Sequence, residues 1–308
     1  MKTIWILTQD SPHEAALKRV LRRAGFDVRL FDRSFDMAGT ARDGDIVMVL
    51  GWAPAALEFA YTRDLMAADG KKLSVVGYMM ETGSYDPMNM AAKGFEIPTK
   101  DWLAMRERAI LGALDACLVA TNHHRQMVKS AFDDFDTDGI KVVGGLLEKS
   151  ELVVYRKPRS AKAKQVFFPY PVAEGQSNPT DGYAEFERVQ GLFNAAHEEQ
   201  AAEVKWVAMT PDMEREDYLE TMSRSQVAFC ARMAEVWPIE MLEAAEVGTF
   251  PMAPARLCYP EVLGQSYCYP EDDEKIVEML RSRLFDKLEL NGVWQSPQDN
   301  LRRALEEL

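Results

Sequence analysis

Residues 232–251 read RMAEVWPIEMLEAAEVGTFP. The apolar run Val227–Cys230 comes just before them, so the sequence predicts a buried strand, a loop and then a helix that opens at Pro238. Glu235 stands in the loop, and Glu243 lies within the helix. The free N–H groups and the dipole at a helix start favour a phosphate-bearing ligand. Ionised carboxylates only accept hydrogen bonds, which suits the hydroxyls of a sugar. The segment therefore indicates a nucleotide-sugar site.

Length and composition are those of an ordinary globular chain. The 308 residues exceed the usual size of a single core, so two domains of about 150 residues are expected. Apolar residues make up 47% of the chain, and no apolar run reaches the roughly 20 residues of a membrane span. The opening MKTIWILT reads as a first strand and not as a signal peptide. Four cysteines without CxxC spacing favour core packing in a reduced, cytoplasmic compartment.

The charge balance argues against a general polyanion-binding surface. The formal net charge is -13, whereas such surfaces are usually basic. One local exception is the stretch 155–164, which holds five basic residues and no acidic one. Arg156, Lys157 and Arg159 are its candidates for contact with an acceptor or a nucleic-acid backbone. A solvated linker between domains is the other interpretation of this stretch, and the sequence leaves both open.

Strands and helices alternate along the chain, which predicts an α/β fold with parallel sheets covered on both faces. The expected strands are 2–8, 27–31, 45–50, 73–78, 116–120, 141–144, 165–168, 204–209, 227–230, 250–253 and 266–269. The expected helices are 14–24, 53–68, 102–114, 123–132, 183–196, 216–223, 238–248, 273–284 and 297–308. The stretch 156–164 is the expected domain boundary, and two such halves leave a cleft at the strand ends.

Several common motifs are missing from the sequence. No G-x-G-x-x-G follows the first strand, which argues against a nicotinamide-dependent dehydrogenase. The chain also lacks a P-loop, a G-x-S-x-G elbow and an H-E-x-x-H helix. The motif search therefore leaves the glutamate pair as the main signal.

The run Arg232–Tyr269 resembles the retaining GT-B glycosyltransferases of family 4, which carry an E-x7-E motif at this junction. More narrowly, GTFPMAPARLCYPEVLG and YCYPEDDEKIVEML look like the tRNA-queuosine mannosyltransferases and related phage-type enzymes. The N-terminal half is similar in a looser way. Ser11-Pro12-His13, residues 78–83 (YMMETG) and Ala120-Thr121-Asn122 fall where that family has Ser-His, Tyr-x-His-Glu-Asn and Phe-Asn-Ser.

The resemblance implies a GT-B architecture of two Rossmann-like domains facing a central cleft. Residues 1–155 would form the acceptor domain and residues 165–296 the nucleotide-sugar domain. Residues 297–308 would form a helix that returns toward the first domain. His13 and Glu81 would lie on loops facing the cleft, where they would take part in catalysis or bind the acceptor. The alternative role of His13 is to cap a helix, and the alternative for Glu81 is a solvated position in a loop.

The resemblance also implies how the donor is held. Glu243 would bind the ribose hydroxyls, and Glu235 would contact the donor sugar or the surroundings of its diphosphate. Backbone N–H groups from Trp237 through Pro238 to Ile239 would face phosphate. Charge-assisted hydrogen bonds of this kind orient a polar ligand strongly.

Two departures from the family pattern stand out. Met80 stands where the family usually has His. The region 168–179 has no basic residue, although the family places Arg and Lys there to neutralise the departing diphosphate. Arg232 and Arg256 are the expected substitutes, and a divalent metal or a loss of transferase activity is the alternative. A structural pair with Glu261 is the other interpretation of Arg256.

These features predict a glycosyltransferase that moves a sugar from a UDP- or GDP-linked donor to a hydroxyl acceptor. The resemblance points to a modified nucleobase in phage DNA or tRNA as the acceptor. The fold requires no cofactor. The expected compartment is the cytoplasm, which would be the host's if the protein is phage-encoded. The alternatives are a sugar-nucleotide epimerase or non-catalytic binding protein on the same fold, and a nucleic-acid-binding module.

Overall fold

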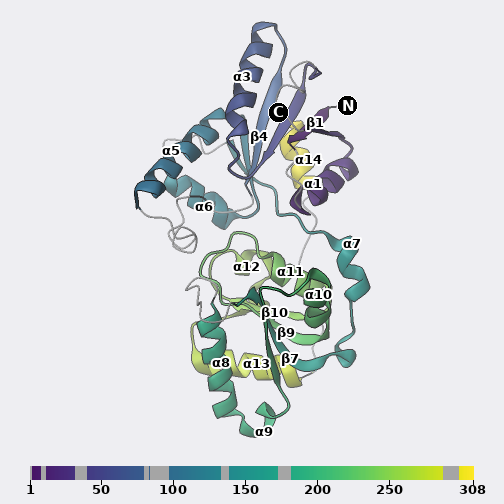
Figure 1. Cartoon of the computed structure of the whole chain (residues 1–308), viewed down its shortest axis with the longest axis vertical. Helices are drawn as coiled ribbons and strands as arrows, with labels where there is room; N and C mark the ends of the chain where they lie inside the picture. Colours follow the sequence, from purple (N-terminus) through teal and green to yellow (C-terminus); the bar gives the residue numbers. More distant parts are fainter. Residues whose placement is uncertain are drawn as a thin grey trace. The chain divides into compact units, whose positions relative to one another are not determined.

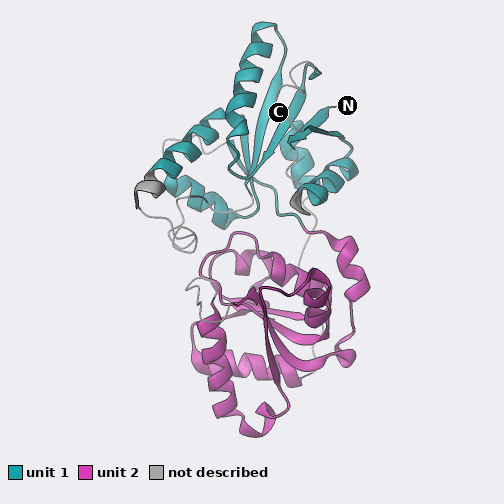
Figure 2. Cartoon of the chain, viewed as in Figure 1, with its two compact units in different colours: residues 1–146, 296–308 teal, residues 147–295 magenta. Residues whose placement is uncertain are grey.

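The computed structural model describes residues 2–7, 12–31, 40–79, 83, 97–132, 139–172, 182–286 and 298–308, without the side chains of 12–13 and 97–101. The chain folds into two compact units (Figure 2). Unit 1 comprises Met1–Leu146 together with Ser296–Leu308, and unit 2 comprises Leu147–Gln295. The basic stretch 156–164 therefore lies inside unit 2, and the border between the units comes earlier in the chain.

Unit 1 is built on a six-stranded parallel sheet with the order β2-β1-β3-β4-β5-β6. Its strands are β1 (Thr3–Leu7), β2 (Asp27–Phe31), β3 (Asp45–Leu50), β4 (Leu73–Met79), β5 (Ala116–Val119) and β6 (Ile140–Val142). The described helices of this unit are α1 (Pro12–Arg23), α3 (Ala55–Ala68), α5 (Ile97–Ala113), α6 (Asn122–Ala131) and α14 (Gln298–Glu306).

The inner strands of unit 1, namely β1, β3, β4 and β5, are apolar and largely buried on both sides, so helices cover both faces of the sheet. Ile4 of β1 belongs to a cluster with Leu17 of α1 and Leu301 of α14. Trp5, its neighbour on the strand, points to the other face and belongs to a cluster with Phe59 of α3. Figure 1 shows α14, drawn in yellow, beside α1, and the two helices are in contact. The last helix thus completes the core of unit 1.

Unit 2 is built on a five-stranded parallel sheet with the order β11-β10-β9-β7-β8. Its strands are β7 (Ala163–Pro171), β8 (Lys205–Met209), β9 (Ser225–Phe229), β10 (Phe250–Pro254) and β11 (Cys268–Tyr269). Its described helices are α7 (Lys149–Leu152), α8 (Tyr183–Ala196), α9 (Glu198–Ala201), α10 (Arg215–Arg224), α11 (Ile239–Glu246), α12 (Tyr259–Val262) and α13 (Asp273–Phe285). Short 3-10 turns lie at Val153–Tyr155, Arg159–Ala161 and Gln265–Tyr267.

The strand order of unit 2 reverses next to its first strand. The chain runs from β7 out to β8 at one edge and then crosses back to β9 on the other side of β7. In open parallel sheets, ligands bind at the carboxyl ends of the strands where the order reverses in this way. Tyr170 and Pro171 at the end of β7, and Cys230 after β9, therefore mark the edge of unit 2 where a ligand site is expected.

The ends of α11 follow from its sequence. Pro238 occupies the N-cap with φ -84 and ψ 73, one position before the first helical residue, and not the first helical position that the sequence predicted. After the C-cap Val247, Gly248 has φ 83, which a residue with a Cβ adopts only at a cost. A Cβ at Gly248 would also lie 2.7 Å from the Lys157 carbonyl oxygen. Glycine is required here for both reasons.

The predicted α/β fold with two parallel Rossmann-like sheets is confirmed. The structure adds short elements that the sequence pattern did not predict, namely α7, α9, α12 and the 3-10 turns. Within the described ranges, no helix has both the length and the apolar character needed to cross a membrane.

Candidate functional site

A pocket of about 600 Å³ opens at the carboxyl edge of the unit 2 sheet. The start of α8, the loop after β9, the loop after β10 and the start of α13 surround it. The side chains that give it polar character include Glu185, Arg188, Arg256, Glu271 and Asp273. Gly182 closes one wall, because a Cβ there would lie 2.5 Å from the Ala231 carbonyl carbon. The pocket thus lies at the edge that the strand order marks out.

Glu235 and Arg232 form an ion pair in the loop after β9. The Arg232 guanidinium lies 3.0 Å from Glu235 Oε2, and it also stacks over the Tyr170 ring at 5.0 Å from the ring centre. The other carboxylate oxygen, Oε1, accepts the backbone N–H groups of Val236 at 3.1 Å and Trp237 at 3.2 Å. Glu235 is therefore held on both oxygens, and Arg232 is placed at the end of β7.

The expected phosphate-binding role of the residues that begin α11 does not match this arrangement. The N–H of Trp237 donates to Glu235, and the N–H of Ile239 donates to the Trp237 carbonyl at 3.0 Å. Pro238 has no N–H to give. The Glu235 carboxylate and the backbone turn therefore use the donors that we expected to face a diphosphate.

Arg232 acts electrostatically on two carboxylates, Glu235, with which it forms an ion pair, and Glu240. Burial raises the pKa of Glu235 to about 7, although Arg232 opposes this rise. Burial also raises the pKa of Glu240, and Arg232 again opposes the rise. Glu240 lies in the first turn of α11, between the two glutamates that the sequence singled out, and it was not among the expected site residues. Its position next to a helix start in the E-x7-E stretch was the available signal.

Glu243 is fixed by two residues of α10. Its side chain is 7% exposed. Arg215 forms a bidentate ion pair with it, in which Nη2 lies 2.5 Å from Oε1 and Nη1 lies 3.1 Å from Oε2. The Tyr218 hydroxyl donates to Oε2 at 2.9 Å. Burial raises the pKa of Tyr218, and the Glu243 charge raises it further. Sequence reasoning did not identify Arg215 or Tyr218, because 25 or more residues separate them from Glu243.

Arg256 lines the pocket, and it does not pair with Glu261 as suggested. One of its Nη atoms lies 3.3 Å from the Glu271 carboxylate, and the other donates to the Ala231 carbonyl at 3.2 Å. The suggested structural pair with Glu261 is therefore replaced by one with Glu271. Arg256 comes after β10, and its side chain reaches the loop after β9, because Nη2 also approaches the Arg232 carbonyl at 3.5 Å. The side chain of one arginine that the sequence offered as a diphosphate partner thus contacts the backbone of the other.

The basic stretch 156–164 does not form one free cationic surface. Lys157 forms an ion pair with Glu220 at 2.8 Å, Arg159 donates to the Arg283 carbonyl, and Lys164 pairs with Glu203. These cations are used within unit 2, so the expected acceptor or nucleic-acid patch is reduced largely to the exposed Arg156.

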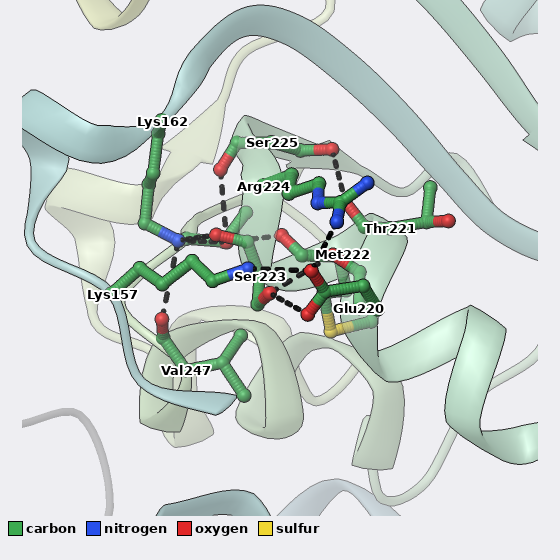
Figure 3. A network of polar contacts seen from close by, with 10 residues as sticks. Lys157, Lys162, Glu220, Thr221, Met222, Ser223, Arg224, Ser225 and Val247 are labelled. Atoms are coloured by element: carbon green, nitrogen blue, oxygen red, sulfur yellow. Dashed lines mark hydrogen bonds and ion pairs between the residues drawn. The ribbon is translucent and has the colours of Figure 1, made fainter. Parts of the chain in front are cut away.

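Lys162 is buried in this stretch and ties two helix ends together (Figure 3). Its Nζ donates to the carbonyl oxygens of Ser223 and Val247 and to Thr249 Oγ1, the last two at 3.2 and 2.9 Å. Burial lowers the pKa of Lys162, and Lys157 lowers it further. Three oxygen acceptors around Nζ favour the ammonium form in turn. Ser223 lies in the last turn of α10 and Val247 caps α11, so this residue holds the two helices together.

The expected catalytic residues of unit 1 have side chains outside the described part of the chain. His13 lies in the first turn of α1 and not on the expected loop, and its side chain falls outside the described residues. Glu81 and Met80 also lie outside them, as does most of the loop after β7. Among the residues that are described, no group of three or more His, Cys, Asp or Glu side chains has a metal-binding arrangement.

Comparisons with known proteins identify the fold. No model of a known protein family matches the chain. A segment of 57 residues, 18% of the chain, is 37% identical to a tRNA-queuosine alpha-mannosyltransferase of Drosophila melanogaster, and it spans 15% of that protein. Among solved structures, one match is a UDP-forming trehalose-phosphate synthase of Burkholderia xenovorans. The alignment covers 100% of this chain and 96% of the synthase chain, with a TM-score of 0.63 and 10% sequence identity.

Two further solved structures agree with this match. One comes from work on glycosyl transfer with retention by trehalose-6-phosphate synthase, and it covers 99% of this chain and 96% of its own at a TM-score of 0.64 and 9% identity. An Escherichia coli structure bound to UDP-2-fluoro glucose covers 96% of this chain and 74% of its own, at a TM-score of 0.58 and 10% identity. At these identities the likeness establishes the fold, which is the GT-B fold of glycosyltransferases.

Proposed function

We propose that this protein is a glycosyltransferase that moves a sugar from a nucleotide-sugar donor to a hydroxyl acceptor. The observation that carries the proposal is the placement of Glu235 and Glu243. Both glutamates lie around α11, at the sheet edge where the strand order of unit 2 reverses, and each is held by an arginine. The GT-B fold and the UDP-2-fluoro glucose bound to one solved structure of that fold support the proposal.

In this proposal unit 2 holds the donor. Glu243 accepts hydrogen bonds from the ribose hydroxyls, and Glu235 accepts one from the donor sugar. Arg232 and Arg256 lie beside the same loop and stabilise the negative charge that develops on the leaving diphosphate. His13 and Glu81 act on the acceptor side of the reaction. In this proposal two guanidinium groups, and not a metal ion, supply the positive charge that the leaving diphosphate requires.

The reaction breaks the bond between the anomeric carbon and the diphosphate oxygen and forms a bond from that carbon to the acceptor oxygen. The acceptor hydroxyl loses its proton, and the nucleoside diphosphate leaves with the bonding electrons. We infer that the configuration is retained, which the match to a synthase studied for transfer with retention supports. The protein accelerates the reaction by positioning the two substrates and by stabilising the leaving group.

For the acceptor, we propose a hydroxyl on a modified nucleobase of tRNA. The 37% identity of a 57-residue segment to a tRNA-queuosine alpha-mannosyltransferase supports RNA as the acceptor over DNA. Because the net charge is -13, tRNA binding would depend on local cations that contact the phosphates, and affinity would fall as salt rises. Binding of tRNA that does not change between low and moderate salt would count against this acceptor.

The donor assignment is tested by thermal unfolding with UDP, GDP and their sugars. A ligand at about 100 times its dissociation constant stabilises the native state by about 2.7 kcal/mol, which gives a clear rise in Tm. Glu243→Ala should abolish that rise, while Glu278→Ala on the exposed face of α13 should keep it. A rise that survives Glu243→Ala would contradict the donor site.

One sequence observation favours a second candidate, a nucleotide-sugar-binding protein or epimerase that does not transfer sugar. The stretch 168–179 lacks the basic residues that assist diphosphate departure in the resembled family. An active transferase should release free nucleoside diphosphate slowly from its donor even without acceptor. A protein that shows the thermal shift but no such release fits the second candidate.

A further inference from the structure

A single guanidinium connects the candidate ribose-binding glutamate to the segment where unit 2 begins. Arg215, at the start of α10, contacts Glu243 on α11 through Nη1 and Nη2. Through Nε and Nη2 it also contacts Glu151 of α7, at 3.2 and 3.3 Å. Arg215 therefore bridges two carboxylates that come from different elements.

The contacts leave little freedom to the Glu243 carboxylate. An ionised carboxylate has about four acceptor positions, and Arg215 and Tyr218 together fill three of them. A bidentate guanidinium fixes the plane of the carboxylate. The remaining acceptor position is on Oε1, because Oε2 receives both Arg215 Nη1 and the Tyr218 hydroxyl.

The helices that carry these residues are joined independently at their other ends. Lys162 donates to the carbonyl oxygens of Ser223 near the end of α10 and of Val247 after α11. Thr249 Oγ1 donates to the Met222 carbonyl at 2.6 Å. Figure 3 shows this network, which contains neither Arg215 nor Glu243. Loss of Arg215 would therefore reorient the Glu243 carboxylate while the two helices stay together.

We propose that Arg215 is a positioning residue for Glu243 and that it sets the preference of the site for nucleotides with an intact ribose. Tyr218 holds the second side of the carboxylate, and Glu151 holds Arg215 in place. This inference rests on the proposed function, because it assumes that Glu243 accepts hydrogen bonds from a ribose. It extends that function by naming the residues that give the carboxylate its direction.

The experiment measures dissociation constants by calorimetry for UDP and for 2′,3′-dideoxyuridine diphosphate, and for the guanosine pair. The wild type should bind the ribose form about tenfold or more tightly, as expected for a hydrogen bond to a charged group. Arg215→Gln should lower this preference to about twofold or less. Arg215→Lys, which keeps the charge but loses the bidentate fork, should give an intermediate preference. Arg281→Gln is the matched control, because Arg281 forms only an exposed pair with Glu278.

The outcomes separate the two claims. If the wild-type protein binds none of these nucleotides, the proposed function is contradicted. A wild type that prefers the ribose form, together with an Arg215→Gln variant of unchanged preference, overturns the positioning role and leaves the function standing. Equal binding of the ribose and dideoxy forms by the wild type also overturns it. Tyr218→Phe and Glu151→Gln each predict a partial loss of preference, which keeps the inference testable if Arg215→Gln does not fold.

Discussion

Lys162 and Thr249 share a hydrogen bond of 2.9 Å in the interior of unit 2, and each also bonds a carbonyl near the end of α10. This contact explains why a lysine is buried in a stretch that reads, in the sequence, like a solvated linker. The ammonium satisfies oxygens at the ends of two helices, where the helix dipole favours a positive charge. The stretch 156–164 thus serves as part of the unit 2 framework.

Lys162→Met should destabilise the protein by about 2–3 kcal/mol, because the substitution removes the hydrogen bonds that the Lys162 ammonium donates to three buried oxygens. Urea unfolding at neutral pH measures the change. The matched control is Lys205→Met at the exposed start of β8, which should change the free energy of unfolding by at most about 0.5 kcal/mol. Equal effects of the two substitutions would show that Lys162 does not join the helices.

Gly248→Ala should destabilise the protein by about 1–3 kcal/mol, since the left-handed backbone and the nearby Lys157 carbonyl both oppose a Cβ. Gly191→Ala is the control, because Gly191 lies within α8 and a Cβ there has no neighbour within 4 Å. The control should be neutral or stabilising by about 0.5–1 kcal/mol. The difference between the two midpoints of thermal unfolding tests the claim.

Glu235 should make stability depend on pH in a defined direction. Its folded pKa of about 7 lies above the ordinary value, so its contribution is fully present below about pH 4.3 and is lost as the pH rises through 7. Glu235→Gln removes the titration. The stability of wild type relative to Glu235→Gln should therefore fall by about 1–3 kcal/mol between pH 4.5 and pH 8. A difference that does not change over this range would contradict the raised pKa.

Arg232→Gln should slow sugar transfer more than it weakens nucleotide binding, because the proposed role of Arg232 is to stabilise charge that grows as the diphosphate leaves. We expect kcat to fall about 10²–10³-fold, as for other lost charge-stabilising donors. Arg188→Gln is the control, since Arg188 is another arginine of unit 2 and pairs with Glu185 and Asp273 at helix starts. Equal losses of kcat in both variants would remove the assignment to Arg232.

Local sequence patterns were sufficient to predict the strands and the longer helices of the fold. Apolar runs predicted the buried strands, and the Pro238 and Gly248 punctuation bounded α11 to within one or two residues. Strand β7 extends beyond the predicted 165–168, to Ala163–Pro171, because pairing with β8 and β9 continues past the apolar run. Pairing with neighbours is a tertiary effect that the pattern of one segment does not contain.

The site was predictable only where its residues are close in the chain. Glu235 and Glu243 follow from one motif, but the partners of Glu243 come from another helix. Helix α7 is only four residues long, and Glu148 caps it by accepting a hydrogen bond from the Ser150 N–H. Such a short helix has no detectable periodicity, yet it carries Glu151. Long-range ion pairs are set by packing, and no local spacing reveals them.

The ion pair of Glu235 has a consequence for how any anion enters this loop. The glutamate already serves as the internal anion of the site, because it occupies the backbone donors at Val236 and Trp237 and the guanidinium of Arg232. A ligand phosphate that uses the same donors has to replace a carboxylate already bound there. Donor binding at this loop is therefore an exchange of one anion for another, and free phosphate would compete poorly with a carboxylate tethered by its own backbone.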